Sequence, residues 1–222
     1  MFRCETMKQN KQKKHSLAWK FGCLLVMFPA AIVAFTLVAI FGFAQYGDTV
    51  KETVQKSQDR VFEVPFPEEN IPLYREAAEI YGIPWTLLAA HHRIETKFST
   101  MDPLLSPVGA EGHMQFMPCT FVGWTHPTCS GLGEGDIPET EKTDPEVIAH
   151  YGGYGVDANG DGIADPYDLE DALHSAANYL AQNGAADDDL ERAIYRYNHS
   201  DAYGADILHY YERYEEEYNQ SS

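Results

Sequence analysis

The stretch from Phe21 to Ala44 contains no charged side chain, and it divides the chain into parts that face different environments. A run of this length can cross the hydrocarbon core of a bilayer, and a proline such as Pro29 is tolerated in a membrane helix. Basic residues precede the run at Arg3, Lys8, Lys11, Lys13, Lys14 and Lys20. Because basic flanks stay in the cytoplasm, we expect a cytoplasmic tail over 1–20, a single transmembrane helix over 21–44, and all later residues on the outer side.

The end of this run also fits a cleavage site. Gly42, Phe43 and Ala44 form a small-x-small triplet that a signal peptidase accepts. The run is longer than the roughly 7–15 apolar residues of a signal peptide, so its length favours an uncleaved anchor. Residues 45–67 are polar and end in two prolines, which is typical of a stalk between a membrane and a domain.

The part of the chain after the anchor is strongly acidic. The whole chain has a net charge of −18, and residues 48–222 carry 33 acidic and 10 basic residues. An acidic surface repels the phosphate backbone of nucleic acids. The composition therefore excludes DNA and RNA as partners.

The four cysteines fall in two environments. Cys4 lies in the expected cytoplasmic tail and Cys23 at the start of the membrane run, whereas Cys119 and Cys129 lie in the exported part. A disulfide is stable outside the cell, so we favour a Cys119–Cys129 bridge, with two free thiols as the alternative. No Cys or His spacing indicates a zinc site.

Helical signals run from residue 68 to the C-terminus. We expect helices over 70–81, 84–95, 118–124, 143–151, 169–183 and 190–197, and a last helix that Asp201 caps, with loops over 99–113 and 125–143. The strongest periodicity places these apolar side chains on one helix face: Leu169, Ala172, Leu173, Ala176, Ala177 and Leu180. No run alternates as strands do, so the sequence predicts one all-α domain over 68–222.

Glu95 ends the most apolar of these helical stretches, which begins at Pro84. Burial disfavours a charged carboxylate, so we expect a raised pKa. A glutamic acid that is protonated near neutral pH can donate a proton to a leaving oxygen. The alternative is an ordinary solvated residue that closes a helix.

The segments around and after Glu95 resemble the transglycosylase SLT family, the lytic transglycosylases related to goose-type lysozyme. The family pattern of Glu-Ser-x-Phe, followed by Ser-x-x-Gly-Ala-x-Gly-x-Met-Gln-x-Met-Pro-x-Thr, is matched at these positions: Glu95, Phe98, Ser106, Gly109, Ala110, Gly112, Met114, Gln115, Met117, Pro118 and Thr120. A later Ala-x-x-x-Tyr-Asn motif is matched at Ala193, Tyr197 and Asn198. Thr96 and His113 depart from the residues usual in the family.

The resemblance implies a lysozyme-like fold and cleavage of the β-1,4 bond between N-acetylmuramic acid and N-acetylglucosamine in peptidoglycan. Glu95 would act first as acid and then as base, which yields a 1,6-anhydromuramic product. The substrate-binding residues would be Ser106, Met114, Gln115, Tyr197 and Asn198. Tyr197 also lies on an apolar helix face, where it could be only a core residue. The chemistry would require no cofactor.

Residues 157–168 follow the spacing of an EF-hand calcium loop. The expected oxygen ligands are Asp157, Asn159, Asp161, the carbonyl of Ile163, Asp165 and Asp168. The twelfth residue is Asp168 instead of the usual glutamate, and it could cap the following helix. A structural calcium ion is the prediction, and a plain Asn-Gly-Asp-Gly turn is the alternative.

Two other functions remain open. A hydrolytic muramidase would need a second carboxylate, for which Asp102 and Glu111 are the candidates nearest in sequence. A non-catalytic, calcium-stabilised module that binds the cell wall would need no acid. The oligomeric state is not encoded in any pattern that we recognise.

Overall fold

The computed structural model describes residues 64–219. The expected cytoplasmic tail, the transmembrane segment and the stalk up to residue 63 lie outside the described residues. Within 64–219, no helix combines the length and the apolar content that a membrane crossing requires.

Helices make up all the regular structure of the described residues, as the sequence predicts. They are η1 (Glu68–Asn70), α2 (Ile71–Tyr81), α3 (Trp85–Thr96), α4 (Pro118–Val122), α5 (Glu139–Lys142), α6 (Pro145–Tyr151), α7 (Leu169–Gln182), η2 (Ala185–Asp187), α8 (Leu190–Tyr197), α9 (Asp201–Tyr214) and η3 (Glu215–Asn219). Between residues 64 and 219, β-pairing is limited to two isolated bridges, Leu105 with Glu111 and Glu111 with Phe116.

Local signals set most helix ends. Gly82 closes α2 in the left-handed conformation, and the Asp144 side chain caps α6 by accepting from the backbone N–H groups of Glu146 and Val147. One expected cap was wrong. Ser200, not Asp201, precedes α9 and accepts from the Tyr203 N–H, because its hydroxyl sits one residue before the first helical turn.

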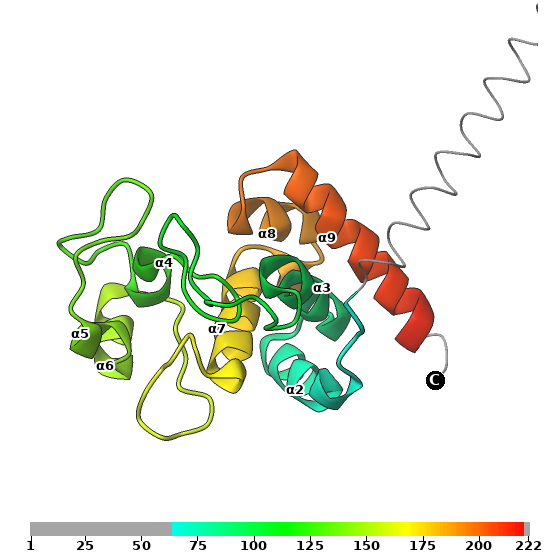
Figure 1. Cartoon of the computed structure of the whole chain (residues 1–222), viewed down its shortest axis with the longest axis horizontal. Helices are drawn as coiled ribbons and strands as arrows, with labels where there is room; N and C mark the ends of the chain where they lie inside the picture. Colours follow the sequence, from blue (N-terminus) through cyan, green and yellow to red (C-terminus); the bar gives the residue numbers. More distant parts are fainter. Residues whose placement is uncertain (1–63, 220–222) are drawn as a thin grey trace, which may run out of the picture. The chain divides into compact units, whose positions relative to one another are not determined.

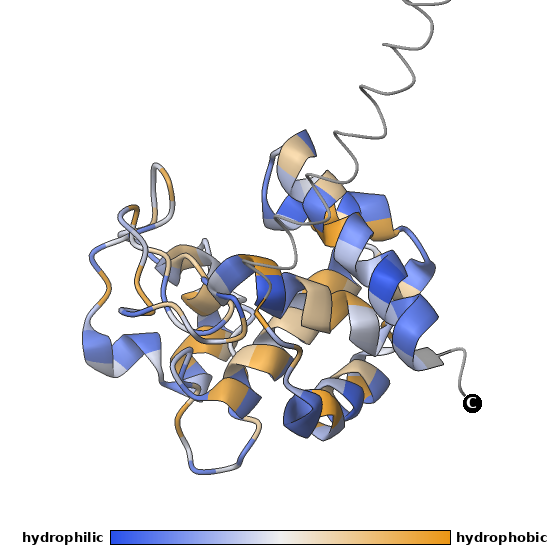
Figure 2. Cartoon of the chain, turned by 45° about the vertical axis from the view of Figure 1, so that its right-hand side comes forward, coloured by the Kyte–Doolittle hydropathy of each residue, from blue (hydrophilic) through white to orange (hydrophobic). Residues whose placement is uncertain are grey.

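The core forms around α7, which lies between α4 and α6 on one side and α2 and α3 on the other (Figure 1). Its predicted apolar face is buried at Ala172, Leu173, Ala176, Ala177 and Leu180. Helix α2 packs on α7, and α9 lies along α3. Figure 2 shows apolar residues gathered on the inner helices and hydrophilic residues on the outer faces, the arrangement that hydrophobic burial produces.

The domain begins earlier than the sequence suggested. Phe66, expected in the stalk, packs against the rings of Tyr74, Phe98 and Tyr214. The carbonyl of Val64 accepts a hydrogen bond from Arg93. Residues 64–67 therefore belong to the folded domain. The sequence did not predict this because Phe66 reaches the core through contacts with distant residues and not through a helical pattern of its own.

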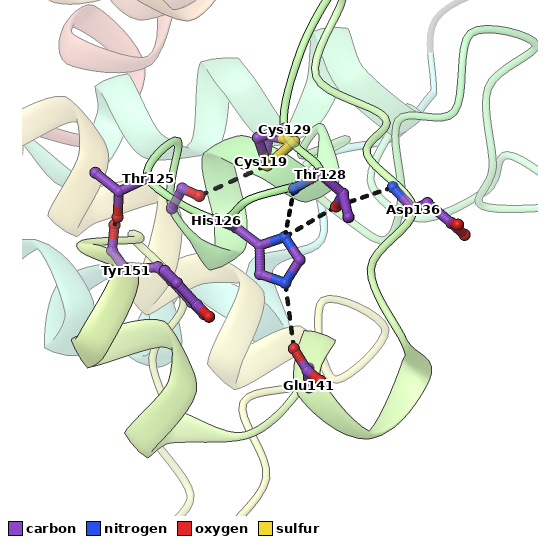
Figure 3. Close-up of a disulfide and its surroundings, with 9 residues drawn as sticks. Cys119, Thr125, His126, Thr128, Cys129, Asp136, Glu141 and Tyr151 are labelled. Atoms are coloured by element: carbon purple, nitrogen blue, oxygen red, sulfur yellow. Dashed lines mark hydrogen bonds and ion pairs between the residues drawn. A yellow bond between two sulfur atoms is a disulfide. The ribbon is translucent and has the colours of Figure 1, made fainter.

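The long loop after α4 is fastened by a disulfide. Cys119 in α4 and Cys129 are bonded, and Cys119, Val122 and Ile137 form a second, smaller apolar cluster. His126 is buried beside the bridge, between Thr128 and the Glu141 carboxylate of α5 (Figure 3). We call residues 123–138 the disulfide loop.

Candidate active site

Glu95 lies in the last turn of α3 and faces α9. Its Oε1 accepts a 2.6 Å hydrogen bond from the Tyr203 hydroxyl. Burial raises the pKa of Glu95 to about 7, although the Tyr203 hydrogen bond works in the opposite direction because it favours the carboxylate. Part of the side chain still reaches solvent. The group can therefore hold a proton near neutral pH and remain accessible to a substrate.

The chain leaves α3 through an unusual backbone path. Lys97, Phe98 and Ser99 all have positive φ, so the chain reverses directly after the acid. The Thr96 hydroxyl donates to the carbonyl of His113 at 2.8 Å. This bond ties the end of α3 to the segment over 106–117, which we call the motif loop.

That loop is shaped by its own side chains. The Ser106 hydroxyl accepts from the Ala110 N–H at 2.9 Å, and the Gln115 amide donates to the Gly112 carbonyl at 2.8 Å. Gly112 has φ of +79°, and a Cβ there would lie 1.9 Å from the carbonyl oxygen of Pro166. Only glycine fits, so Gly112 reflects close backbone packing against residues 157–168, which we call the aspartate loop.

Met114 and Tyr197 meet across the core. The Tyr197 hydroxyl donates to the Met114 carbonyl at 2.8 Å, and the Met114 side chain has no exposed surface. Met114, expected to bind substrate, thus contributes packing and a carbonyl, because its side chain points into the core. Asn198 is exposed just after α8.

A pocket of about 230 Å³ opens beside Gln115 and Tyr197. Its other lining residues are Phe116, Met117, Thr120, Trp124, Leu132, Tyr179, Arg196 and His199. Gln115 and Tyr197 therefore line the same pocket, whereas Glu95, Ser106 and Asn198 do not line it. Sequence reasoning missed Tyr203, Trp124 and Arg196. For Tyr203 a signal existed, since it lies four residues before the buried Ile207 and hence on the inner face of α9.

A chain of hydrogen bonds runs behind the acid. It joins Tyr74 Oη to His92 Nδ1 at 2.7 Å, His92 Nε2 to Ser99 Oγ at 2.7 Å, Ser99 Oγ to His113 Nδ1 at 2.6 Å, and His113 Nε2 to the Tyr167 carbonyl at 2.9 Å. A carbonyl only accepts, so His113 Nε2 carries the proton and each earlier group donates to the next.

Both imidazoles in this chain are neutral. Burial lowers the pKa of His92 to about 3 and also lowers the pKa of His113. Every ring nitrogen has a protein partner, which leaves no free nitrogen for a metal. These hydrogen bonds link α2, α3 and the motif loop, and so position the end of α3 that carries Glu95.

The two candidate second carboxylates are placed differently. Glu111 forms a 2.7 Å ion pair with Lys142, and both side chains are largely buried. Asp102 is exposed in the loop after α3. Glu111 is therefore neutralised by a lysine instead of being available as a base.

The aspartate loop is organised by backbone hydrogen bonds. Asp157 accepts from the N–H groups of Gly160, Asp161 and Gly162, and Asp168 caps α7. The completely buried Asp171 accepts from three more N–H groups, those of Ala158, Asn159 and Asp165. In the described part of the chain, no three or more His, Cys, Asp or Glu side chains are arranged to hold a metal. Calcium binding by residues 157–168 stays a prediction.

Comparison with known proteins gives one match. The model of the transglycosylase SLT domain matches residues 148–191, which run from α6 through the aspartate loop and α7 into α8. This match supports the lytic transglycosylase family and a protein that acts on peptidoglycan. It does not include Glu95 or Tyr197. No curated protein and no solved structure matches the chain.

Proposed function

We propose that this chain is a lytic transglycosylase with a lysozyme-like domain, and that Glu95 is its acid and base. The observation that carries the proposal is the Glu95–Tyr203 pair, in which burial raises the pKa of the carboxyl group to about 7. The family match over 148–191 supports the substrate class independently of that pair.

The chemistry follows from one carboxyl group. Protonated Glu95 gives its proton to the glycosidic oxygen as the bond to muramic C1 breaks. The resulting carboxylate, to which Tyr203 donates a hydrogen bond, then takes the proton of the muramic C6 hydroxyl as that oxygen bonds to C1. The products are a 1,6-anhydromuramic end and a free N-acetylglucosamine end, and Glu95 regains its proton.

A hydrolytic muramidase is the second candidate. Hydrolysis by an inverting route needs a second carboxylate that activates water. The Lys142 ion pair occupies Glu111, which favours the transglycosylase over the hydrolase. Asp102 remains the candidate base for hydrolysis.

The placement of the enzyme is also part of the proposal. The uncharged run over 21–44 with its basic flank supports a membrane anchor with the domain on the cell-wall side. Cleavage would then be confined to glycan strands close to the bilayer.

Product analysis tests the function. The purified wild-type protein and Glu95→Gln are incubated with peptidoglycan, and the soluble products are identified by mass spectrometry. We expect anhydromuropeptides from the wild type and a rate about 10²–10⁴-fold lower for Glu95→Gln, since the amide cannot donate the proton. Tyr195→Phe, a change on an exposed ring of α8, is the matched control and should retain activity.

Other products would contradict the proposal. Reducing muramic ends from the wild type would indicate a hydrolase, and Asp102→Asn would then be examined. Binding to peptidoglycan without any soluble product would indicate a non-catalytic wall-binding module.

A further inference from the structure

The pocket beside Gln115 and Tyr197 has a wall that the proposed chemistry does not use. Trp124 and Leu132 belong to the disulfide loop, and both side chains are more than half exposed. Arg196 and His199 face them from α8 and the turn after it. The pocket thus combines an aromatic ring, an aliphatic side chain and a guanidinium group with Gln115 and Tyr197 of the candidate site.

Arg196 lacks the ion pairs that Lys142 and Arg192 form with carboxylates. Lys142 pairs with Glu111 and Glu139, and Arg192 pairs with Asp187 and Asp189. No carboxylate in the part of the chain that the structure describes lies within ion-pair distance of Arg196. In so acidic a chain, a guanidinium without a carboxylate at the edge of a pocket is available for an anionic ligand.

The opposite wall is held in place before any ligand arrives. Gly133 passes beneath the indole of Trp124, where a Cβ would lie 3.1 Å from the ring. The Cys119 N–H donates to the Gly133 carbonyl at 2.8 Å, and the Cys119–Cys129 bond closes the same loop. A wall fixed at both points loses little conformational entropy on binding.

The substrate supplies a matching group. The glycan itself is uncharged apart from what the muramic lactyl group carries, and in peptidoglycan that group bears a short peptide with free carboxylates. A neutral sugar gains little from a guanidinium, whereas a carboxylate forms charge-assisted hydrogen bonds with it. The apolar side chains of Trp124 and Leu132 suit the methyl and methylene groups of such a peptide.

We propose that this pocket binds a carboxylate of the stem peptide on muramic acid, with Arg196 as its ionic partner and Trp124 and Leu132 as the apolar wall. The proposal rests on the proposed function and defines its substrate further: peptide-bearing strands with free carboxylates are cut faster than strands whose carboxylates are blocked. Arg196 is a specificity residue and takes no part in proton transfer.

The test compares native peptidoglycan with peptidoglycan whose carboxylates are amidated by carbodiimide and ammonia. We expect amidation to lower kcat/KM of the wild type roughly two- to fivefold, which corresponds to the loss of an accessible ion pair. Arg196→Gln should show the same loss on native substrate and no further loss on amidated substrate. Arg192→Gln, on the same helix but outside the pocket, should behave like the wild type. Equal sensitivity of Arg196→Gln and the wild type to amidation would overturn the proposal.

A binding measurement separates this proposal from the proposed function. Calorimetry with the Glu95→Gln protein and a purified, uncleaved muropeptide tetrasaccharide requires no turnover. We expect the native ligand to bind roughly two- to fivefold more tightly than the amidated ligand, and this difference to disappear when Arg196→Gln is added. A difference that persists without Arg196 would refute the pocket, even if the wild type releases anhydromuropeptides. If the wild type releases no product, the expected binding difference would support the pocket alone.

Discussion

At the scale of single residues, burial and the hydroxyl of Tyr203 act in opposite directions on the pKa of Glu95. The hydrogen bond between them favours the carboxylate, while burial favours the protonated form and prevails. Because two opposed effects act on one group, a small change at Tyr203 shifts the pH range in which the Glu95 carboxyl group is protonated.

Tyr203→Phe should therefore move the alkaline limb of the pH–rate profile to higher pH. A hydrogen bond is worth about 0.5–1.5 kcal/mol, so we expect a shift of roughly 0.5–1 pH unit in kcat/KM. Tyr197→Phe is the control, because the Tyr197 hydroxyl donates to the Met114 carbonyl and not to Glu95. It should leave the alkaline limb of the pH–rate profile unchanged. A shift to lower pH in Tyr203→Phe would show that the hydroxyl does not stabilise the carboxylate.

Glu95 should also lower stability at high pH. Its pKa is about 7 in the folded state and near 4.5 when unfolded, so the unfolded state releases the proton first and folded stability falls as the pH rises through this window. We expect Glu95→Gln to be more stable than the wild type at pH 8, on the order of 2 kcal/mol, and equally stable at pH 4. Urea unfolding at both pH values measures the difference, and a variant less stable at pH 8 would contradict the raised pKa.

At the scale of elements, the disulfide loop and the aspartate loop are long irregular segments fastened in different ways. The first has a covalent bond and the buried His126, and the second has hydrogen bonds that converge on Asp157 and the buried Asp171. Each borders the segment that carries Gly112 and Gln115: Trp124 and Leu132 line the pocket with Gln115, and Pro166 packs on Gly112.

Removal of the disulfide should lower activity while the helix content stays the same. Closing a loop of 10 residues contributes about 2–3 kcal/mol in the chain-entropy model. We expect Cys119→Ala with Cys129→Ala to lower the free energy of unfolding by roughly that amount, raise KM, and preserve the far-ultraviolet circular dichroism spectrum. Cys4→Ala is the control. Unchanged KM would mean that the loop does not form part of the substrate site.

Calcium should affect the aspartate loop without being required for folding, because its turns are already complete. Circular dichroism in EDTA should show full helix content. If the predicted ion binds, millimolar CaCl₂ should raise the melting temperature through ligand linkage, and Asp161→Asn should reduce that rise. Equal concentrations of MgCl₂ control for ionic strength. An identical melting temperature in EDTA and CaCl₂ would leave the loop as a turn only.

The elements show what a sequence can and cannot predict. Caps and periodicity are local, so α2, α3, α6 and α7 were predicted closely. Glu95, Gln115 and Tyr197 were predicted through motifs. Phe66, Tyr203 and the Arg196 pocket were missed because they depend on contacts between distant segments. Met114 was predicted to bind substrate, but its side chain is buried, and a motif position does not show which way a side chain points.

At the scale of the whole molecule, net charge governs how fast the protein meets an anionic substrate. The chain carries a net charge of −18, and peptidoglycan with free peptide carboxylates is also anionic. Long-range repulsion slows the encounter of two like-charged partners, and salt screens it over about 10 Å at 0.1 M.

Raising the salt concentration from 20 to 150 mM should therefore increase kcat/KM on native peptidoglycan by a few-fold. Amidated peptidoglycan has fewer charges and should show a weaker dependence, which makes it the matched control. A fall in kcat/KM with salt on native peptidoglycan would mean that local attraction, such as that of Arg196, outweighs the overall repulsion.

The contact between Glu95 and Tyr203 joins residues 108 positions apart, one near the start of the domain and one in its last long helix. A ribosome completes α9 only after every other α-helix of the domain has been made. Until then the carboxyl group lacks its tyrosine, and α3 lacks the helix that covers it. A nascent chain, or one cleaved by a protease before residue 201, would lack Tyr203 and would therefore be inactive. The proposed transglycosylase would thus gain its activity only once the whole domain has been made and folded.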